Sequence, residues 1–203
     1  MTDGRGAWSA PVAALFAFAL FAVAVPGSAQ PAGSRFQFGA VGGVTFLLPD
    51  TGFNTGSGYH VALFAQYNAQ KAISLRVEAG FASASGLDPD PDPHLSNGSR
   101  RIFSGMADVI LSASGRVRPY MFAGGGAARI TAKATGYSDY QGVFTVEDEK
   151  NPLGFRFGAG VSAPSGGIAG VFLELRYSTL PSSGGNLIPS DAYYLSLVAG
   201  VRF

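Results

Sequence analysis

Residues 73–81 read Ile-Ser-Leu-Arg-Val-Glu-Ala-Gly-Phe, a stretch in which apolar and polar or small residues alternate. Successive side chains of a β-strand point to opposite faces, so the odd-numbered residues form an apolar face and Arg76 and Glu78 share the other. A strand of this kind fits a water-soluble sheet with its apolar face inside, or a membrane barrel with its apolar face turned to lipid. The rest of the chain decides between the two.

The same alternation recurs eight times along the chain, in segments of about 10 to 13 residues that are typical of membrane-crossing strands. These segments are 35–47, 59–67, 72–84, 101–112, 117–132, 153–162, 168–178 and 192–203. The stretches between them alternate strictly in length: 48–58, 85–100, 133–152 and 179–191 are long, whereas 68–71, 113–116 and 163–167 are short. Outer-membrane barrels have short periplasmic turns and long outer loops, so the alternation predicts that both termini of the mature chain lie on the periplasmic side.

The composition argues against an ordinary water-facing surface. Of the 203 residues, 47% are hydrophobic and only 13% are charged, about half the usual fraction of charged residues in soluble domains. The formal net charge of +1 argues against an electrostatic nucleic-acid binder, and the absence of cysteine excludes a disulfide scaffold or a cysteine-ligated metal site. The 29 glycines show no collagen spacing.

The N-terminus predicts export. Arg5 precedes the apolar run Val-Ala-Ala-Leu-Phe-Ala-Phe-Ala-Leu-Phe-Ala-Val-Ala-Val at 12–25, and small residues before Gln30 suit cleavage there. The run is shorter than the ~20 residues that a transmembrane helix needs. We therefore predict a signal peptide at 1–29 and one domain at 30–203.

No later stretch reaches 18 consecutive apolar residues, and only helices or closed barrels satisfy every backbone group in lipid. The predicted fold is all-β: an eight-stranded antiparallel transmembrane up-and-down β-barrel after a cleaved N-terminal signal peptide. Its inner face carries charges that need partners. These charges are Arg76, Glu78, Asp108, Arg129, Arg156, Glu174, Arg176 and Arg202. We interpret them as a salt-bridge network that fills the lumen; a gated ion path is the alternative.

Aromatic residues gather near the ends of the predicted strands, as the interfacial girdles of membrane barrels require. They are Tyr59, Tyr67, Phe81, Phe103, Tyr120, Tyr177, Tyr193 and Phe203.

Two stretches carry a resemblance to a known family. Residues 118–126, Arg-Pro-Tyr-Met-Phe-Ala-Gly-Gly-Gly, and residues 194–203, Tyr-Leu-Ser-Leu-Val-Ala-Gly-Val-Arg-Phe, resemble the outer-membrane β-barrel domain family, specifically the small eight-stranded OmpA/OmpX-like barrels. The resemblance implies a C-terminal signal read by the barrel assembly machinery. Its residues here are Tyr194, Leu197, Ala199, Val201 and Phe203.

Two places invite an enzymatic or metal-binding interpretation. The predicted loop Asp88–His94 contains three carboxylates and an imidazole. These groups could bind a divalent cation, or resemble the Asp and His pairs of omptin-type proteases. Prolines at every second position, however, hold the segment extended and keep the carboxylates apart. His60 is the only histidine in a predicted strand, and no serine stands two residues after it. We expect neither place to be catalytic and predict no cofactor and no metal.

The predicted function is that of a bacterial outer-membrane protein without enzyme activity, with a structural or surface role, long extracellular loops and a plugged polar lumen. A small ion or solute pore is the alternative, and a lipid A-modifying enzyme is a remote one. Expected partners are outer-membrane lipid or lipopolysaccharide, the barrel assembly machinery and periplasmic chaperones, with no nucleic acid. The sequence suggests no particular extracellular ligand.

Overall fold

The computed structural model describes residues 35–48, 56–87, 95–138, 142–165, 169–181 and 191–203. These residues form nine strands: β1 (Phe36–Leu47), β2 (Ser57–Asn68), β3 (Ile73–Leu87), β4 (Leu95–Ser112), β5 (Arg118–Ser138), β6 (Gly142–Lys150), β7 (Leu153–Ser165), β8 (Ala169–Pro181) and β9 (Asp191–Arg202). None of the described residues forms a helix long and apolar enough to cross a membrane.

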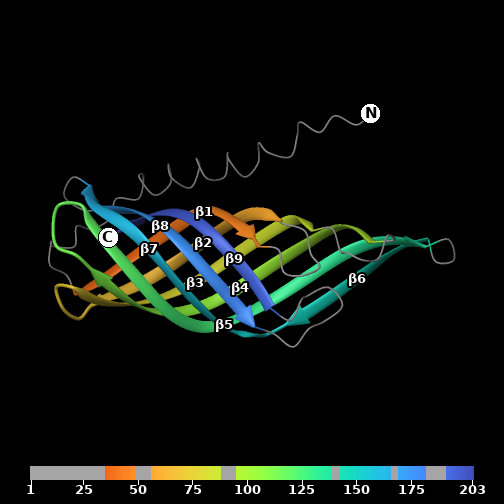
Figure 1. The fold of residues 1–203 in the computed structure, drawn as a ribbon, viewed down its shortest axis with the longest axis horizontal. Coiled ribbons are helices and arrows are strands. Elements are labelled where there is room, and N and C mark those ends of the chain that lie inside the picture. The colour runs from red at the N-terminus through yellow and green to blue at the C-terminus, as the bar shows by residue number, and fades with distance from the viewer. Residues whose placement is uncertain (1–34, 49–55, 88–94, 139–141, 166–168, 182–190) are drawn as a thin grey trace.

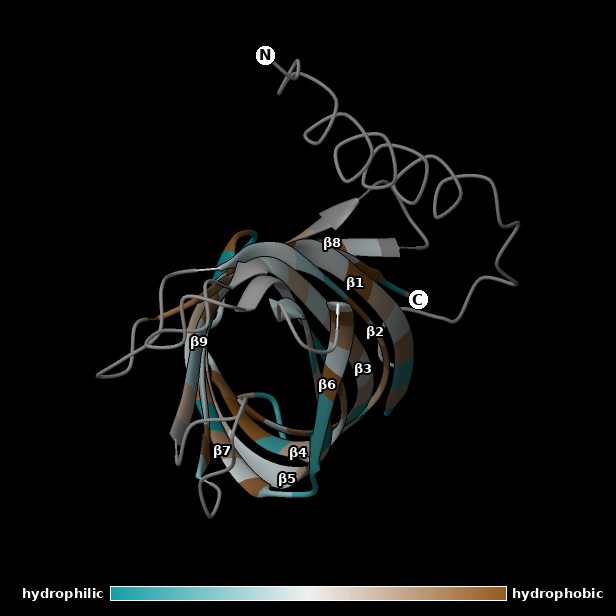
Figure 2. Cartoon of the chain, turned by 90° about the vertical axis from the view of Figure 1, so that its right-hand side faces the viewer, coloured by the Kyte–Doolittle hydropathy of each residue, from teal (hydrophilic) through white to brown (hydrophobic). Residues whose placement is uncertain are grey.

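Eight of the nine strands close into a barrel (Figure 1). The pairing order is β4-β3-β2-β1-β9-β8-β7-β5, and a further pairing between β4 and β5 joins the two ends of this series. Every pairing is antiparallel, including the one that brings β1 to β9 with Gly39 opposite Arg202. The predicted eight-stranded antiparallel barrel is therefore confirmed, and the closed ring is visible end-on in Figure 2.

The ninth strand, β6, corrects the prediction of a long connection at 133–152. β5 continues to Ser138 and then pairs with β6 from Ile130 opposite Lys150 to Ser138 opposite Gly142. Gly142 adopts a φ of 70°, which suits the turn between these two strands. The stretch at 85–100 is likewise shorter than predicted, because β3 and β4 extend into it. Strands β3 to β6 thus form a sheet that rises beyond the rest of the barrel on one side (Figure 1).

The outer wall is apolar along most strands. Leu63 on β2, Val77 on β3 and Phe155 on β7 are each more than 60% exposed. Such large apolar side chains on the outside of a folded domain need a non-aqueous environment. The alternation read from the sequence thus assigns the correct outward face to seven of the eight predicted segments.

The segment at 117–132 has the opposite orientation from the one predicted. Tyr120, Phe122 and Ile130 are buried inside the barrel, whereas Met121 and Arg129 face outward. The physical reason is that both faces of this segment are apolar or small around the three glycines at 124–126, so no contrast marks the inward side. Tyr120 consequently does not belong to the outer aromatic girdle.

The interior consists of two apolar layers with a charged layer between them, not of the uniformly polar face predicted. The layer near the short turns contains Val41, Ala62, Phe64, Ile110, Tyr120, Phe122, Phe172 and Val198. The layer near the opposite end includes Leu47, Ile102, Met106, Ile130, Leu180 and Tyr194. Inward glycines make room for the rings: a Cβ on Gly39 would overlap the Phe64 ring, and one on Gly158 would lie 2.5 Å from the Phe122 ring.

Candidate functional site

The charged layer is built from four strands that reach across the lumen. β3 contributes Arg76 and Glu78 at alternate positions, β8 contributes Glu174 and Arg176 in the same spacing, and the remaining two are Asp108 of β4 and Arg156 of β7. β3 and β8 lie four places apart in the ring of eight, so their side chains meet from opposite walls. All six side chains are at most 4% exposed.

Arg156 connects two acidic residues. Its Nε donates to Asp108 Oδ1 at 2.9 Å, its Nη2 to Asp108 Oδ2 at 2.6 Å, and its Nη1 to Glu78 Oε1 at 2.5 Å. The two bonds to Asp108 form the bidentate geometry in which a guanidinium binds a carboxylate most strongly. Glu78 also accepts a bond of 2.9 Å from Arg176 Nη1.

Arg76 completes the layer on the side of the short turns. Its Nε donates to Asp108 at 3.1 Å and its Nη1 to Glu174 at 2.5 Å. The guanidinium carbon lies 4.8 Å from the centre of the Phe122 ring, within the range of a cation–π contact. Tyr120, which the sequence assigned to the outer wall, donates its hydroxyl to Glu174 at 2.7 Å.

The six charges sum to zero, three arginines against three carboxylates, and each is bound to at least two others. Buried ions are tolerated only when they are paired and hydrogen-bonded in this way. Two small cavities adjoin the layer, of about 10 Å³ beside Arg76 and about 30 Å³ beside His60 and Arg176. Each has room for about one or two water molecules. In the described part of the chain, these six paired side chains are buried in the middle of the lumen.

Six of the eight residues predicted for the lumen network come together in this layer. The prediction was wrong for Arg129, which is 61% exposed on the outer wall and pairs with Glu149 of β6 at 2.6 Å, because the faces of its segment are inverted. Arg202 lies at the end near the short turns, outside the charged layer, and donates from Nη2 to Ser162 Oγ at 3.1 Å. Tyr120 would have been found if the inward face of its strand had been read correctly.

His60 lies at the edge of the charged layer. Its Nε2 is 3.4 Å from Arg176 Nη1 and 3.8 Å from Glu78 Oε1, and its side chain is 12% exposed. The hydroxyls of Thr45 on β1 and Ser196 on β9 line the same small cavity as His60 and form a hydrogen bond with each other. No group of three or more potential metal ligands occurs in the residues that the structure describes. The loop Asp88–His94 and the predicted signal peptide at 1–29 lie outside these residues.

The outer wall carries aromatic contacts at both ends. Phe36 packs on Tyr67 near the short turns, with ring centres 4.9 Å apart. Near the other end, Tyr59, Phe81 and Phe103 form one continuous row across three strands, and Phe157, Tyr177 and Tyr193 form another. Rings at these heights are typical of the two interfacial girdles of a membrane barrel.

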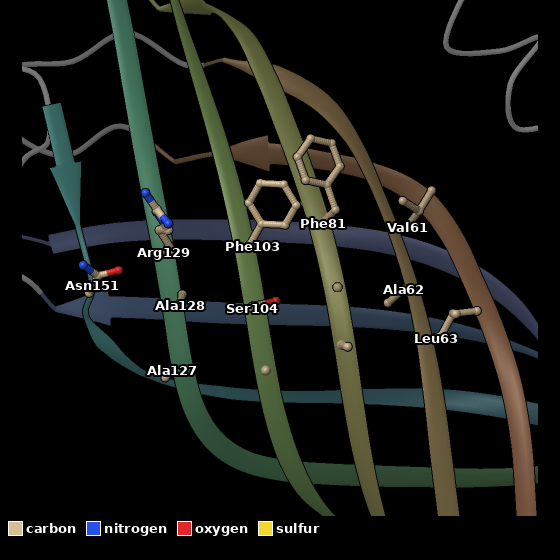
Figure 3. Close-up of a pocket in the computed structure, with 13 residues that line it drawn as sticks. Val61, Ala62, Leu63, Phe81, Phe103, Ser104, Ala127, Ala128, Arg129 and Asn151 are labelled. Carbon is tan, nitrogen blue, oxygen red and sulfur yellow. The ribbon is translucent and has the colours of Figure 1, made fainter. Parts of the chain in front are cut away.

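A shallow groove of about 820 Å³ runs beneath the first of these rows (Figure 3). Its floor is formed by small outward residues, among them Ala79, Gly105 and Ala127 on neighbouring strands. Phe81 and Phe103 lie side by side along it, with Leu63 on one flank and Arg129 on the other. The Arg129 guanidinium is already neutralised by Glu149, so the groove presents an apolar surface without a free charge.

The residues predicted as a C-terminal assembly signal occupy both faces of β9. Tyr194 points into the barrel and is only 7% exposed. The other four residues lie at the alternate positions that face outward: Leu197, Ala199, Val201 and Phe203. The Phe203 backbone exchanges two hydrogen bonds with Phe38, of 2.8 and 3.2 Å, so the last residue is held against β1.

An antiparallel barrel with an apolar exterior, aromatic bands and buried charges in its interior belongs to the class of membrane-spanning β-barrels. The family model of the outer membrane protein beta-barrel domain matches residues 15–203, and the chain belongs to this family. The resemblance to this family that was read from residues 118–126 and 194–203 is thereby confirmed. No curated protein matches the chain.

The fold is similar to three solved structures from Gram-negative bacteria and Thermus. Neisserial surface protein A has a TM-score of 0.53 at 18% identity, covering 83% of this chain and 96% of that one. Ail, the attachment invasion locus protein of Yersinia pestis, has a TM-score of 0.51 at 16% identity, covering 84% and 99%. A major outer membrane protein from Thermus thermophilus has a TM-score of 0.58 at 18% identity, covering 84% and 100%. At these identities the likeness concerns the fold.

Proposed function

We propose that this protein is a non-enzymatic outer-membrane barrel in which a sealed lumen anchors a structure displayed at the cell surface. The observation that carries the proposal is the charged layer. Three buried arginines and three buried carboxylates lie paired between two apolar layers, and the two cavities beside them have volumes of about 10 and 30 Å³. Such an interior suits mechanical rigidity and does not suit the passage of solutes.

The part displayed at the cell surface is the sheet of strands β3 to β6 that extends beyond the rest of the barrel, together with the loops at that end. We propose that this end faces the outside and that both mature termini lie in the periplasm after the signal peptide is removed. Support comes from the short turns that gather at the opposite end, since outer-membrane barrels keep their short turns in the periplasm. Delivery by periplasmic chaperones and insertion by the assembly machinery belong to the same proposal.

Conductance in planar lipid bilayers tests the sealed lumen. We expect no steady conducting level from the wild-type barrel. A double variant with Arg156→Ala and Glu78→Ala removes two side chains of the charged layer and serves as the positive control, because it should conduct. A reproducible conducting level from the wild type would refute the anchor and favour a pore.

The surroundings of His60 support the absence of catalysis. The imidazole is enclosed between Arg176 and Glu78 inside the barrel, away from the wall that lipid substrates reach. Mass spectra of lipid A from cells with and without the gene provide the test. Identical spectra are expected, and a change in acylation would overturn the non-enzymatic assignment.

The proposed orientation is tested on whole cells. A protease-sensitive tag inserted between β5 and β6, at residues 139–141, should be cut from outside. A tag inserted in the short turn between β4 and β5, at residues 113–117, should be cut only when the outer membrane is permeabilised. The reverse pattern would overturn the orientation without affecting the proposal of a sealed lumen.

A further inference from the structure

Two arginines meet at the mouth of the lumen, at the end with the short turns. Arg118 begins β5 at an inward position, two residues before the buried Tyr120. Arg202 ends β9 on the inward face of that strand, and its side chain reaches across β8 to β7, where Nη2 donates to Ser162 Oγ at 3.1 Å. Ser162 pairs opposite Arg118, and its hydroxyl oxygen lies 3.5 Å from the Arg118 carbonyl oxygen. The two arginines therefore converge on one buried serine.

The local structure holds both arginine side chains in place. Gly170 of β8 pairs opposite Arg202, and a Cβ on this glycine would lie 2.8 Å from Arg202 Nε and 3.2 Å from its Cγ. The Arg202 side chain thus occupies space that only a glycine leaves open. Arg118 is held by the turn before it, because its Nε donates to the Gly115 carbonyl at 3.0 Å. A guanidinium has five N–H donors, so most donors of both arginines remain available for a ligand.

No carboxylate neutralises this pair. In the part of the chain that the structure describes, neither arginine forms an ion pair, and their two positive charges act on each other. Glu174 belongs to the charged layer, where Arg76 and Arg176 already bind it. The three short turns at this end, 69–72, 113–117 and 166–168, contain no acidic residue. Like charges that converge without a counter-ion repel each other, and a bound anion would remove that repulsion.

We propose that Arg118 and Arg202, positioned by Ser162 and Gly170, form a binding site for a phosphate group at the mouth of the lumen. A guanidinium binds phosphate through paired hydrogen bonds, and two fixed guanidiniums match the double negative charge of a phosphate. Both side chains start from the inward faces of their strands, so the site is reached from the water in the mouth and not from the lipid around the outer wall. The ligand is therefore a water-borne phosphate compound, which the orientation proposed above places in the periplasm.

Calorimetric titration with inorganic phosphate tests the site. The full mature chain is folded in zwitterionic detergent micelles, and phosphate is added at constant ionic strength so that general screening does not change. We expect one saturable site per barrel in the wild type. Arg118→Gln and Arg202→Gln should each weaken phosphate binding by about tenfold or more, because a hydrogen bond to a charged group contributes at least this factor.

Two further variants separate the site from general charge effects. Lys71→Gln removes the same charge from another short turn at the same end and should leave phosphate binding unchanged. Gly170→Ala keeps every charge but displaces the Arg202 side chain, so it should weaken binding severalfold. A heat-dependent gel shift confirms that each variant is folded before its titration.

The absence of saturable binding by the folded wild type would overturn the proposal. Equal weakening by Lys71→Gln and Arg118→Gln would also overturn it, because attraction would then depend on net charge alone. A second titration in micelles that contain phosphatidylglycerol identifies the source of the phosphate. Unchanged binding of inorganic phosphate supports a water-borne ligand, whereas competition by phosphatidylglycerol would overturn that part of the proposal in favour of a lipid head group. None of these results depends on the orientation in cells.

Discussion

Replacing Arg156 with methionine should be among the most damaging single changes in this barrel. Arg156 is 4% exposed and donates three hydrogen bonds, two to Asp108 and one to Glu78. Methionine keeps much of the apolar stem and removes only the charged head. The charged layer is then left with two arginines against three carboxylates.

The size of the effect follows from what is left behind. Asp108 keeps a single bond of 3.1 Å from Arg76, and Glu78 keeps one of 2.9 Å from Arg176. Removing one partner of a buried ion pair costs about 3–5 kcal/mol, because the remaining charge stays buried. We therefore expect the free energy of unfolding of Arg156→Met to fall by about this amount.

Two variants make the experiment diagnostic. Arg129→Met removes the same charge from an exposed pair with Glu149 and should cost about 1 kcal/mol or less. Combining Arg156→Met with Asp108→Leu restores equal numbers of buried charges, so the double variant should be less destabilised than the sum of its two single variants.

Urea unfolding in lipid vesicles provides the measurement, followed by circular dichroism or by gel mobility. Tryptophan fluorescence is not suitable, since the one tryptophan of the chain, Trp8, precedes the barrel. The reasoning is refuted if Arg156→Met costs no more than Arg129→Met, or if the double variant equals the sum of its single variants.

Three further changes have defined expectations. Gly158→Val should destabilise the barrel by about 1–3 kcal/mol because its side chain would overlap the Phe122 ring, whereas Gly105→Val, at an outward position with open space, should be close to neutral in the same urea titration. Phe103→Ala should reduce stability in vesicles by about 1–3 kcal/mol, since its ring packs against Phe81 in the girdle, and a loss confined to detergent would contradict this role. Deleting Phe203 should sharply lower insertion in cells while refolding into detergent stays near wild type; equal, mild losses in both assays would make it an ordinary apolar residue.

The barrel could be predicted well from the sequence because each lipid-facing strand shows the alternation of apolar and polar residues within its own segment. Seven segments have large apolar residues at every second position and polar or small ones between, as in 73–81, and each such segment reveals its own inward face. Strand ends carry no comparable signal. β6 escaped notice because its exposed Glu147 and Glu149 make it look like a loop, although they pair across to cations of β5.

The interior was predicted less completely, for two reasons. The glycines at 124–126 have no side chain to mark a face, and apolar residues stand on both sides of them, so the inward orientation of Tyr120 is decided by its neighbours in the barrel and not by its own strand. In addition, which charged side chains meet in the lumen depends on how the strands close into the barrel. Nothing local to Arg76 indicates that it meets Glu174, which lies 98 residues further along the chain.

That separation has a consequence for how the protein assembles. The ion pairs of the charged layer join residues 48, 78 and 98 positions apart, and they connect strands that are two, three and four places apart in the ring of eight. A sheet of only the first five strands would expose Arg76 and Glu78 without Arg156 or Glu174, and uncompensated charges are costly in hydrocarbon. Partly formed barrels should therefore be strongly disfavoured inside the bilayer. Strand pairing, entry into the membrane and neutralisation of the lumen are expected to occur together, so that closure is a single cooperative step in the folding of this chain.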